Sequence, residues 1–146
     1  MPLPAPDSKG DLPEGLHPAT LDEIVERFGR GTPRRQAVAK RLIRIYEIVQ
    51  ATNKLDRFVI FGSFVTSKPE PNDVDIVLVM RDDFDLKSVS EETAKLFNHA
   101  QAEDEFGASI FWVRPSLLIL ESADEFLAHW QLKRDGTRRG IVEVKA

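Results

Sequence analysis

The sequence predicts an α/β (α+β) domain in which a small mixed β-sheet is backed by helices. Helical patterns come first along the chain, and strand and helix patterns then alternate to its end, which is the order typical of such domains. The chain has 146 residues, the length of one domain, with no room for a second full core. Hydrophobic residues make up 42% and charged residues 30%, as in ordinary globular domains.

Composition excludes several classes of function. Acidic residues outnumber basic ones by 24 to 20, whereas proteins that bind through non-specific phosphate contacts usually carry a basic surplus. There are no cysteines, which excludes disulfides, thiolate zinc sites and cysteine nucleophiles. The three histidines, His17, His99 and His129, lack metal-ligand spacing. Because no apolar run or secretory signal is present, we expect a cytoplasmic protein with no membrane partner.

The N-terminus is rich in proline, with five of the nine prolines among residues 1–18. Proline fixes φ and lacks the N–H that regular structure uses. The pattern therefore predicts a proline-rich arm over residues 1–19 and a folded domain over residues 20–146. Within the arm we expect residues 1–10 to be a loose end, and Leu12 and Leu16 to contact the core.

Two helices should follow the arm. Residues 20–23 (Thr-Leu-Asp-Glu) form a capping-box pattern, which predicts a short helix that ends before Gly29. Thr32-Pro33 then opens a longer helix, because proline suits the first helical turn. Apolar residues recur along it at helical spacing: Val38, Leu42, Ile45 and Val49. Its basic residues are expected on a solvated face: Arg34, Arg35, Lys40, Arg41 and Arg44.

Two strands form the centre of the predicted sheet. Residues 58–61 are fully apolar and end at Gly62-Ser63, and residues 74–80 are rich in β-branched side chains. Alternation along the second strand puts Asp73 and Asp75 on the same face as Val77 and Val79.

The remaining elements continue the alternation. A capping box at residues 88–91 predicts a helix that reaches about Asp104, and Gly107 introduces a strand over 108–113. A second capping box, at residues 122–125, predicts a helix through about Trp130.

An Asp-Gly turn at residues 135–136 leads into a final strand over 141–144. The aromatic residues of the C-terminal half are expected to serve packing rather than stacking on a base: Phe106, Phe111, Trp112, Phe126 and Trp130.

The segment with the clearest chemistry joins Gly62-Ser63 to Asp73-x-Asp75 through a spacer over residues 64–72. Glycine allows a sharp turn and a close approach of phosphate to the backbone, and serine adds a hydroxyl group. Two carboxylates on one strand face can share a hard cation such as Mg²⁺. A metal held there can bridge a triphosphate and stabilise displacement at phosphorus.

A structural role for the same residues is the alternative, in which Asp73 and Asp75 cap a strand in a plain interaction module. Asp75 is the residue that argues against this, because it places a charge inside an otherwise apolar strand. A buried carboxylate without a partner costs several kcal/mol. A metal ion or another cation would compensate for that cost.

Together, Gly62, Ser63, Asp73 and Asp75 resemble the signature of the nucleotidyltransferase superfamily (the DNA polymerase beta-like fold), in particular its minimal stand-alone bacterial members. That signature is an apolar strand, Gly-Ser, a spacer and Asp-hydrophobic-Asp. An uncharacterised branch of these proteins is similar over nearly the whole chain, in three segments: Leu12 to Phe28, Gly62 to Thr66, and Asp135 to Val144.

The resemblance implies that Asp73 and Asp75 are catalytic and bind Mg²⁺ (or Mn²⁺), and that Gly62 and Ser63 hold the phosphates of a nucleoside triphosphate. It implies transfer of a nucleotidyl group to a hydroxyl on a protein, an RNA end or a small molecule. Relatives carry a third acid on a later strand, where this chain has Ser109. Four residues are candidates to replace it: Glu103, Asp104, Glu105 and Glu143.

The serine also supports an alternative function. A catalytically weak or inactive protein would retain the fold and bind nucleotide or a partner. Minimal members often pair with a helical protein from a neighbouring gene, as toxin–antitoxin components do. Both functions therefore remain open from the sequence.

Overall fold

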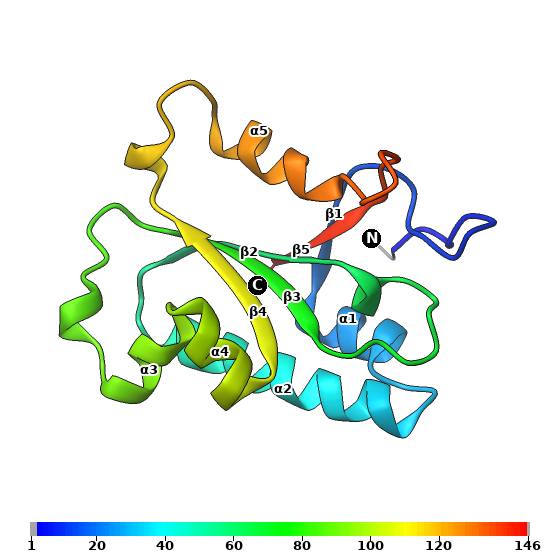
Figure 1. The fold of residues 1–146 in the computed structure, drawn as a ribbon, viewed down its shortest axis with the longest axis horizontal. Coiled ribbons are helices and arrows are strands. Elements are labelled where there is room, and N and C mark those ends of the chain that lie inside the picture. Colours follow the sequence, from blue (N-terminus) through cyan, green and yellow to red (C-terminus); the bar gives the residue numbers. More distant parts are fainter. Residues whose placement is uncertain (1–2, 146) are drawn as a thin grey trace.

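The computed structural model describes residues 3–145 and contains a five-stranded mixed sheet in the order β1-β5-β2-β3-β4 (Figure 1). The strands are β1 (Leu16–Thr20), β2 (Leu55–Phe61), β3 (Val74–Met80), β4 (Ala108–Val113) and β5 (Ile141–Lys145). The helices are α1 (Leu21–Phe28), α2 (Pro33–Gln50), α3 (Glu91–Leu96), α4 (His99–Phe106) and α5 (Ala123–Ala128). The predicted α/β class is confirmed.

The sheet combines both kinds of strand pairing. β2 lies antiparallel to β3 on one side and to β5 on the other, whereas the outer pairs β1–β5 and β3–β4 are parallel. The end of β2 and the beginnings of β3 and β4 therefore meet at one end of the sheet.

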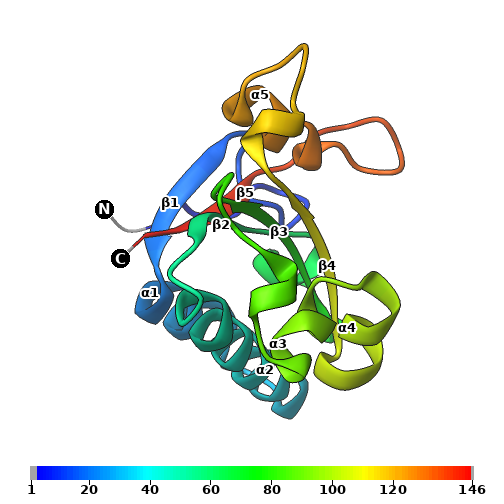
Figure 2. The same cartoon turned by 90° about the vertical axis from the view of Figure 1, so that its left-hand side faces the viewer.

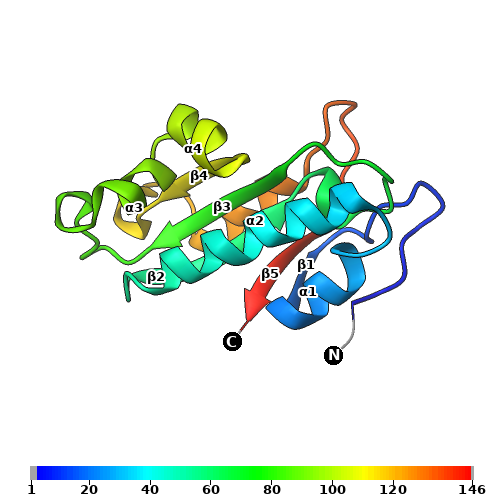
Figure 3. The ribbon, with the colours of Figure 1, turned by 90° about the horizontal axis from the view of Figure 1, so that it is seen from below.

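The helices cover the two faces unequally. Figure 2 shows α1, α2, α3 and α4 on one side of the sheet and α5 on the other, and Figure 3 shows α2 running nearly along β3. Because α5 is a short helix of six residues, it leaves part of its face of the sheet uncovered.

The helices of residues 3–145 include none with the length and apolar character of a membrane span.

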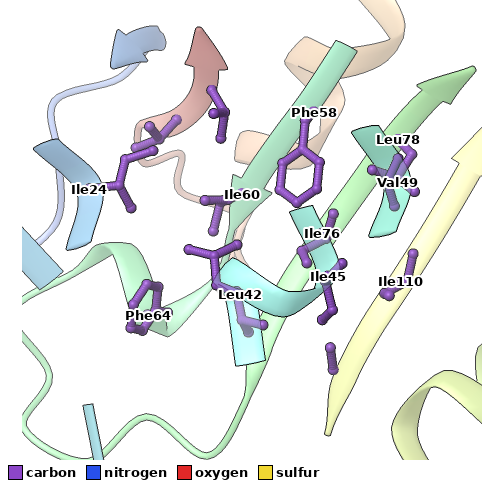
Figure 4. Close-up of a cluster of buried hydrophobic side chains, with 14 of the residues drawn as sticks. Ile24, Leu42, Ile45, Val49, Phe58, Ile60, Phe64, Ile76, Leu78 and Ile110 are labelled. Atoms are coloured by element: carbon purple, nitrogen blue, oxygen red, sulfur yellow. The ribbon is translucent and has the colours of Figure 1, made fainter. Parts of the chain in front are cut away.

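The main core lies between the sheet and α2 (Figure 4). The predicted helical stripe of α2 is fully buried, from Val38 to Val49. It packs against alternate residues of β2, β3 and β4, which are Phe58, Ile60, Ile76, Leu78 and Ile110. This packing explains why every second residue of these strands, on the face toward α2, is apolar. A second, smaller cluster under α5 includes Val59, Val77, Val79, Leu127 and Ile141.

Three of the predicted helix starts are confirmed. Thr20, Thr32 and Ser122 each accept a hydrogen bond from the backbone N–H three residues later. Thr20 and Ser122 complete a capping box, because the glutamate at that third position binds the cap in return.

The single helix predicted from Ser88 to Asp104 is wrong, since two helices occupy that segment. Ser90, not Ser88, caps α3. The chain then breaks at Phe97, and the Asn98 side chain accepts a bond from the N–H of Gln101 to cap α4. An asparagine that can satisfy a first-turn N–H favours a new helix start over continuation.

The proline-rich arm is part of the fold. Its last residues form β1, an edge strand where Pro18 is tolerated because no second ladder needs its N–H. Leu3 and Leu12 are buried, and Gly10 accepts a backbone hydrogen bond from Ser67 at 2.9 Å. The loose end predicted for residues 1–10 is therefore wrong for residues 3–10, and residues 1 and 2 lie outside the described chain.

Candidate functional site

A pocket of about 800 Å³ opens on the α5 face of the sheet, at the end where β2 finishes and β3 and β4 begin. Its floor and near wall come from six residues: Phe61, Gly62, Ser63, Asp75, Ser109 and Phe111. Three of the four residues that the sequence singled out, Gly62, Ser63 and Asp75, thus line one pocket. The fourth, Asp73, contacts the pocket residue Ser109.

Position 62 requires glycine for two reasons, its backbone conformation and the atoms that lie next to it. Its φ is 81° and its ψ is −164°, a conformation available essentially to glycine alone. A Cβ atom built on Gly62 would overlap Oδ2 of Asp75. The turn after β2 therefore needs glycine in order to pass over the carboxylate of the neighbouring strand.

Ser63 begins the short 3₁₀ turn Ser63–Val65 directly after this glycine. Its carbonyl accepts bonds from the N–H of Thr66 at 3.2 Å and from the hydroxyl of Thr66 at 2.6 Å. These bonds fix the turn, so that Ser63 is held at the pocket wall.

Arg35 holds the same loop from the opposite side. Its side chain donates to the carbonyls of Phe28 at 3.0 Å, Phe64 at 2.9 Å and Thr66 at 2.6 Å, and also to that of Lys68. Arg35 is buried, and this burial lowers its pKa despite the nearby carboxylate of Glu70. The prediction of a solvated basic face on α2 is therefore wrong for Arg35, which ties α2 to the loop.

The N-terminal ends of β3 and β4 bring three residues close together, which are Asp73, Asp75 and Ser109. The strand register places Asp75 opposite Ser109. The hydroxyl of Ser109 lies 3.4 Å from Oδ2 of Asp73 and 3.3 Å from Oε1 of Glu103. Asp73, just before β3, and Glu103, on α4, therefore lie beside one hydroxyl group, on the residue that pairs with Asp75.

The two aspartates are perturbed by their surroundings. Burial raises the pKa of Asp75 to about 6, the negative charge of Asp73 adds to the increase, and Ser109 and Arg139 partly oppose it. Burial also raises the pKa of Asp73, against a lowering by Ser109. Arg41 also lowers the pKa of Asp73, but by less than burial raises it. Neither aspartate forms an ion pair within residues 3–145, and a bound cation would favour their charged forms.

Glu143 does not supply the third acid. Arg57 donates to both of its carboxylate oxygens, at 2.9 and 2.7 Å. Burial alone would raise the pKa of Glu143, but Arg57, assisted by Lys145, lowers it overall. Glu143 is therefore engaged in a structural ion pair.

Glu103 is the acid that reaches the site. Besides its contact with Ser109, it lies 3.0 Å from Nε2 of His99, and its charge raises the pKa of both aspartates. The sequence could not select it from its neighbours, because the choice depends on how α4 packs beside β4.

The donor set fits Mg²⁺ only in part. Among the described residues, no three Asp, Glu, His or Cys side chains are grouped so that they could hold a metal ion by themselves. Mg²⁺ commonly takes one or two carboxylates together with substrate phosphates and water. Asp73 and Asp75 provide such a pair of hard oxygen ligands, so the residues fit an ion that arrives with a phosphorylated substrate.

Four basic residues also line the pocket and are here called the basic rim; the sequence did not single them out as site residues. Lys133, Arg134 and Arg139 come from the segment between α5 and β5, and Lys68 comes from the loop after Ser63. The carboxylate of Asp11, in the N-terminal arm, lies 2.9 Å from Lys133 and 3.4 Å from Arg139. The arm thus positions two of the four cations.

The prediction that the C-terminal aromatic residues only pack is confirmed for Phe106, which is buried, and is incomplete for Phe111 and Trp130. Both line the pocket, and 38% of Phe111 is exposed. Their placement depends on the strand order, which no local pattern reveals.

Comparison with known proteins gives a family and nothing more specific. No curated protein and no solved structure matches the chain. The sequence profile of one family, described as a family of unknown function (DUF6932), matches residues 4–145. Since this match covers the arm, the sheet and the pocket, the chain belongs to the DUF6932 family.

Proposed function

We propose that this protein is a nucleotidyltransferase, which transfers a nucleotidyl group from a nucleoside triphosphate to a hydroxyl acceptor in the presence of Mg²⁺. One observation carries the proposal. Asp73 and Asp75 meet at Ser109 beside a pocket of about 800 Å³, and the turn that leads into this pocket needs a glycine in order to clear Asp75. A carboxylate pair beside a tight glycine turn suits a metal-bound triphosphate.

Each group in the pocket has a role in this proposal. Asp73 and Asp75 are the catalytic acids and would hold Mg²⁺ (or Mn²⁺), which neutralises phosphate charge and stabilises in-line displacement. Gly62 and Ser63 lie next to them and would bind the phosphates through backbone N–H and hydroxyl groups. Lys68 at the basic rim adds positive charge for the rest of the triphosphate.

The transfer step leaves the protein itself unchanged. The acceptor oxygen forms a bond to the α-phosphorus, the bond from that phosphorus to the α–β bridging oxygen breaks, and pyrophosphate leaves. The proton of the acceptor hydroxyl passes to a base, a role for which the candidate is Glu103, 3.3 Å from the hydroxyl of Ser109. The side chain of Glu103 is 52% exposed, so that its proton can return to solvent.

A second function is favoured by Ser109 itself. A serine beside Asp75 cannot carry the negative charge of a third acid, and Glu103 belongs to a different element from the acid in the related proteins. The protein would then bind nucleotide with slow or absent transfer and act through a partner, as a toxin–antitoxin-like component does. Under this hypothesis the partner is a helical protein encoded by a neighbouring gene, and the two proteins act in the cytoplasm. Nucleic acid would take part only as an acceptor.

Pyrophosphate release with each labelled nucleoside triphosphate and Mg²⁺ separates the two functions. The assay is run with the protein alone, with RNA, and with the neighbouring gene's product. Release that is lost in Asp75→Asn supports transfer, and binding without release supports the second function. The control is Asp56→Asn, because Asp56 is exposed near the start of β2, away from the pocket. Absence of nucleotide binding would contradict both.

A further inference from the structure

The pocket has a continuous aromatic wall, formed by Phe61, Phe111 and Trp130. The ring of Trp130 lies between the other two, with its centroid 4.8 Å from that of Phe61 and 4.9 Å from that of Phe111. The centroids of Phe61 and Phe111 are 6.3 Å apart. Three separate elements, β2, β4 and the turn after α5, therefore bring their rings together at one surface.

The aromatic wall lies directly beside the acidic pair. Phe61 is the β2 partner of Asp75 in the strand register. Phe111 follows Ser109 on the same face of β4, two residues along the strand. A ligand that reaches Asp75 with its phosphates would therefore pass along these rings.

A second aromatic cluster in the protein shows what packing alone looks like. This cluster is formed by Phe84, Phe97 and Trp112, whose ring centroids are 4.8 to 5.6 Å apart. Phe84 and Phe97 are buried. The indole N–H of Trp112 donates to the carbonyl of Phe97 at 3.0 Å. In the aromatic wall, by contrast, all three rings line an open pocket. The wall thus presents aromatic surface that the fold leaves uncovered.

Basic residues also line the pocket: Lys68, Lys133, Arg134 and Arg139. A ligand complementary to this pocket has a flat apolar part and several negative charges. A nucleoside triphosphate has both, whereas a sugar phosphate or an inorganic phosphate lacks the flat part.

We propose that the aromatic wall is the nucleobase subsite, in which the base of the nucleotide stacks on Phe111 and Trp130. This inference rests on the proposed function and adds the part of the substrate that the carboxylates do not contact. Stacking tolerates any base because every base has a π-face. The ring of His99, 4.9 Å from that of Phe111, lies at the edge of this subsite.

The test compares two ligands that differ only in the nucleoside. Isothermal titration measures the affinity of Mg²⁺–ATP and of Mg²⁺–tripolyphosphate for the wild type, for Phe111→Leu and for Phe111→Trp. Phe111 is partly exposed, so that these variants keep the core intact. Tyr46→Leu is the control, because Tyr46 is a partly exposed ring on α2 at the other face of the sheet.

We expect ATP to bind the wild type more tightly than tripolyphosphate. Phe111→Leu should weaken ATP binding by about tenfold without changing that of tripolyphosphate, and Phe111→Trp should retain the ATP affinity. ATP, but not tripolyphosphate, should quench the fluorescence of Trp130. Tyr46→Leu should match the wild type with both ligands.

Two results overturn the inference in distinguishable ways. If ATP and tripolyphosphate bind equally, or if Phe111→Leu leaves ATP affinity unchanged, the wall does not hold the base, while the phosphate site and the proposed function stand. A Phe111→Leu variant that loses only affinity for the hydroxyl acceptor likewise shows that the wall does not hold the base. If neither ligand binds, the proposed function fails, and the inference fails with it.

Discussion

Two acidic side chains on the same face of the sheet show how differently a fold can treat a buried carboxylate. Glu143, on β5, is 4% exposed, and Arg57 donates a hydrogen bond to each of its carboxylate oxygens. Asp75, on β3, forms no ion pair among residues 3–145, and it faces a second carboxylate, that of Asp73. The fold has completed the first site with its own cation and has left the second incomplete.

The contrast appears in the pKa values. Arg57 outweighs the effect of burial and lowers the pKa of Glu143, whereas burial and Asp73 raise that of Asp75 to about 6. A partner that is permanently present makes a carboxylate structural. A carboxylate without one costs stability in the free protein, and this cost is offset only when a cation binds. The comparison therefore distinguishes Glu143, a carboxylate that stabilises the fold, from Asp75, a carboxylate that we assign to function.

The largest expected effect comes from removing the charge of Glu143. Glu143→Gln should destabilise the protein by about 2–3 kcal/mol, because it leaves a partly buried guanidinium with only the exposed Asp124 as an acidic partner. Urea unfolding measures this loss. A loss below about 0.5 kcal/mol would mean that the Arg57–Glu143 pair contributes no more than a surface ion pair.

The pH dependence of stability should reveal Asp75. The pKa of Asp75 is raised to about 6 in the folded protein. Its stabilising contribution to the free energy of unfolding is therefore fully present below about pH 4 and is lost as the pH rises to about 6. In EDTA, Asp75→Asn should therefore gain about 2 kcal/mol relative to the wild type between pH 4 and pH 7. Parallel stability curves for the two proteins would show that Asp75 is not perturbed.

The next effect concerns the phosphate contact beside the unpaired acid. Ser63→Ala should weaken Mg²⁺-dependent triphosphate binding by about 1.5 kcal/mol, through loss of a hydrogen bond to a charged group. Titration calorimetry measures the change. Unchanged affinity would show that Ser63 only shapes the turn after Gly62.

The smallest effect should come from adding a third acid to the incomplete site. Ser109→Asp should raise Mg²⁺ affinity in the presence of nucleotide by about three- to tenfold, because an additional charged ligand strengthens the site, and it should increase turnover. Wild-type turnover at ordinary enzymatic rates, about 1–10³ per second, would instead show that Glu103 already completes the site.

The sequence was sufficient for features that depend on neighbouring residues. Caps such as Thr20, the apolar stripe of α2 and the alternation along β3 depend on periodicity and on one or two side chains. The same alternation placed Asp75 on the face of the sheet that carries Val77 and Val79. These predictions hold because the tertiary structure uses the local preferences rather than overriding them.

Features that depend on strand order could not be predicted. β1 was missed because Pro18 and the prolines before it suggest an arm without regular structure, yet one ladder with β5 is enough to hold the strand. Trp130, Lys133, Arg134 and Arg139 lie on the chain between α5 and β5, and they reach the pocket because β5 inserts between β1 and β2. Likewise, Glu103 was one of four candidates until the packing of α4 brought it to Ser109.

The most direct test measures the affinity of a nucleoside triphosphate, with Mg²⁺ and with EDTA, for the wild type, Asp75→Asn and Glu143→Gln at a temperature where all three are folded. The wild type and Glu143→Gln should bind more tightly with Mg²⁺, and Asp75→Asn should lose this Mg²⁺-dependent gain. If Asp75→Asn binds as the wild type does, Asp75 is not a metal ligand, and the central distinction between the two carboxylates is wrong.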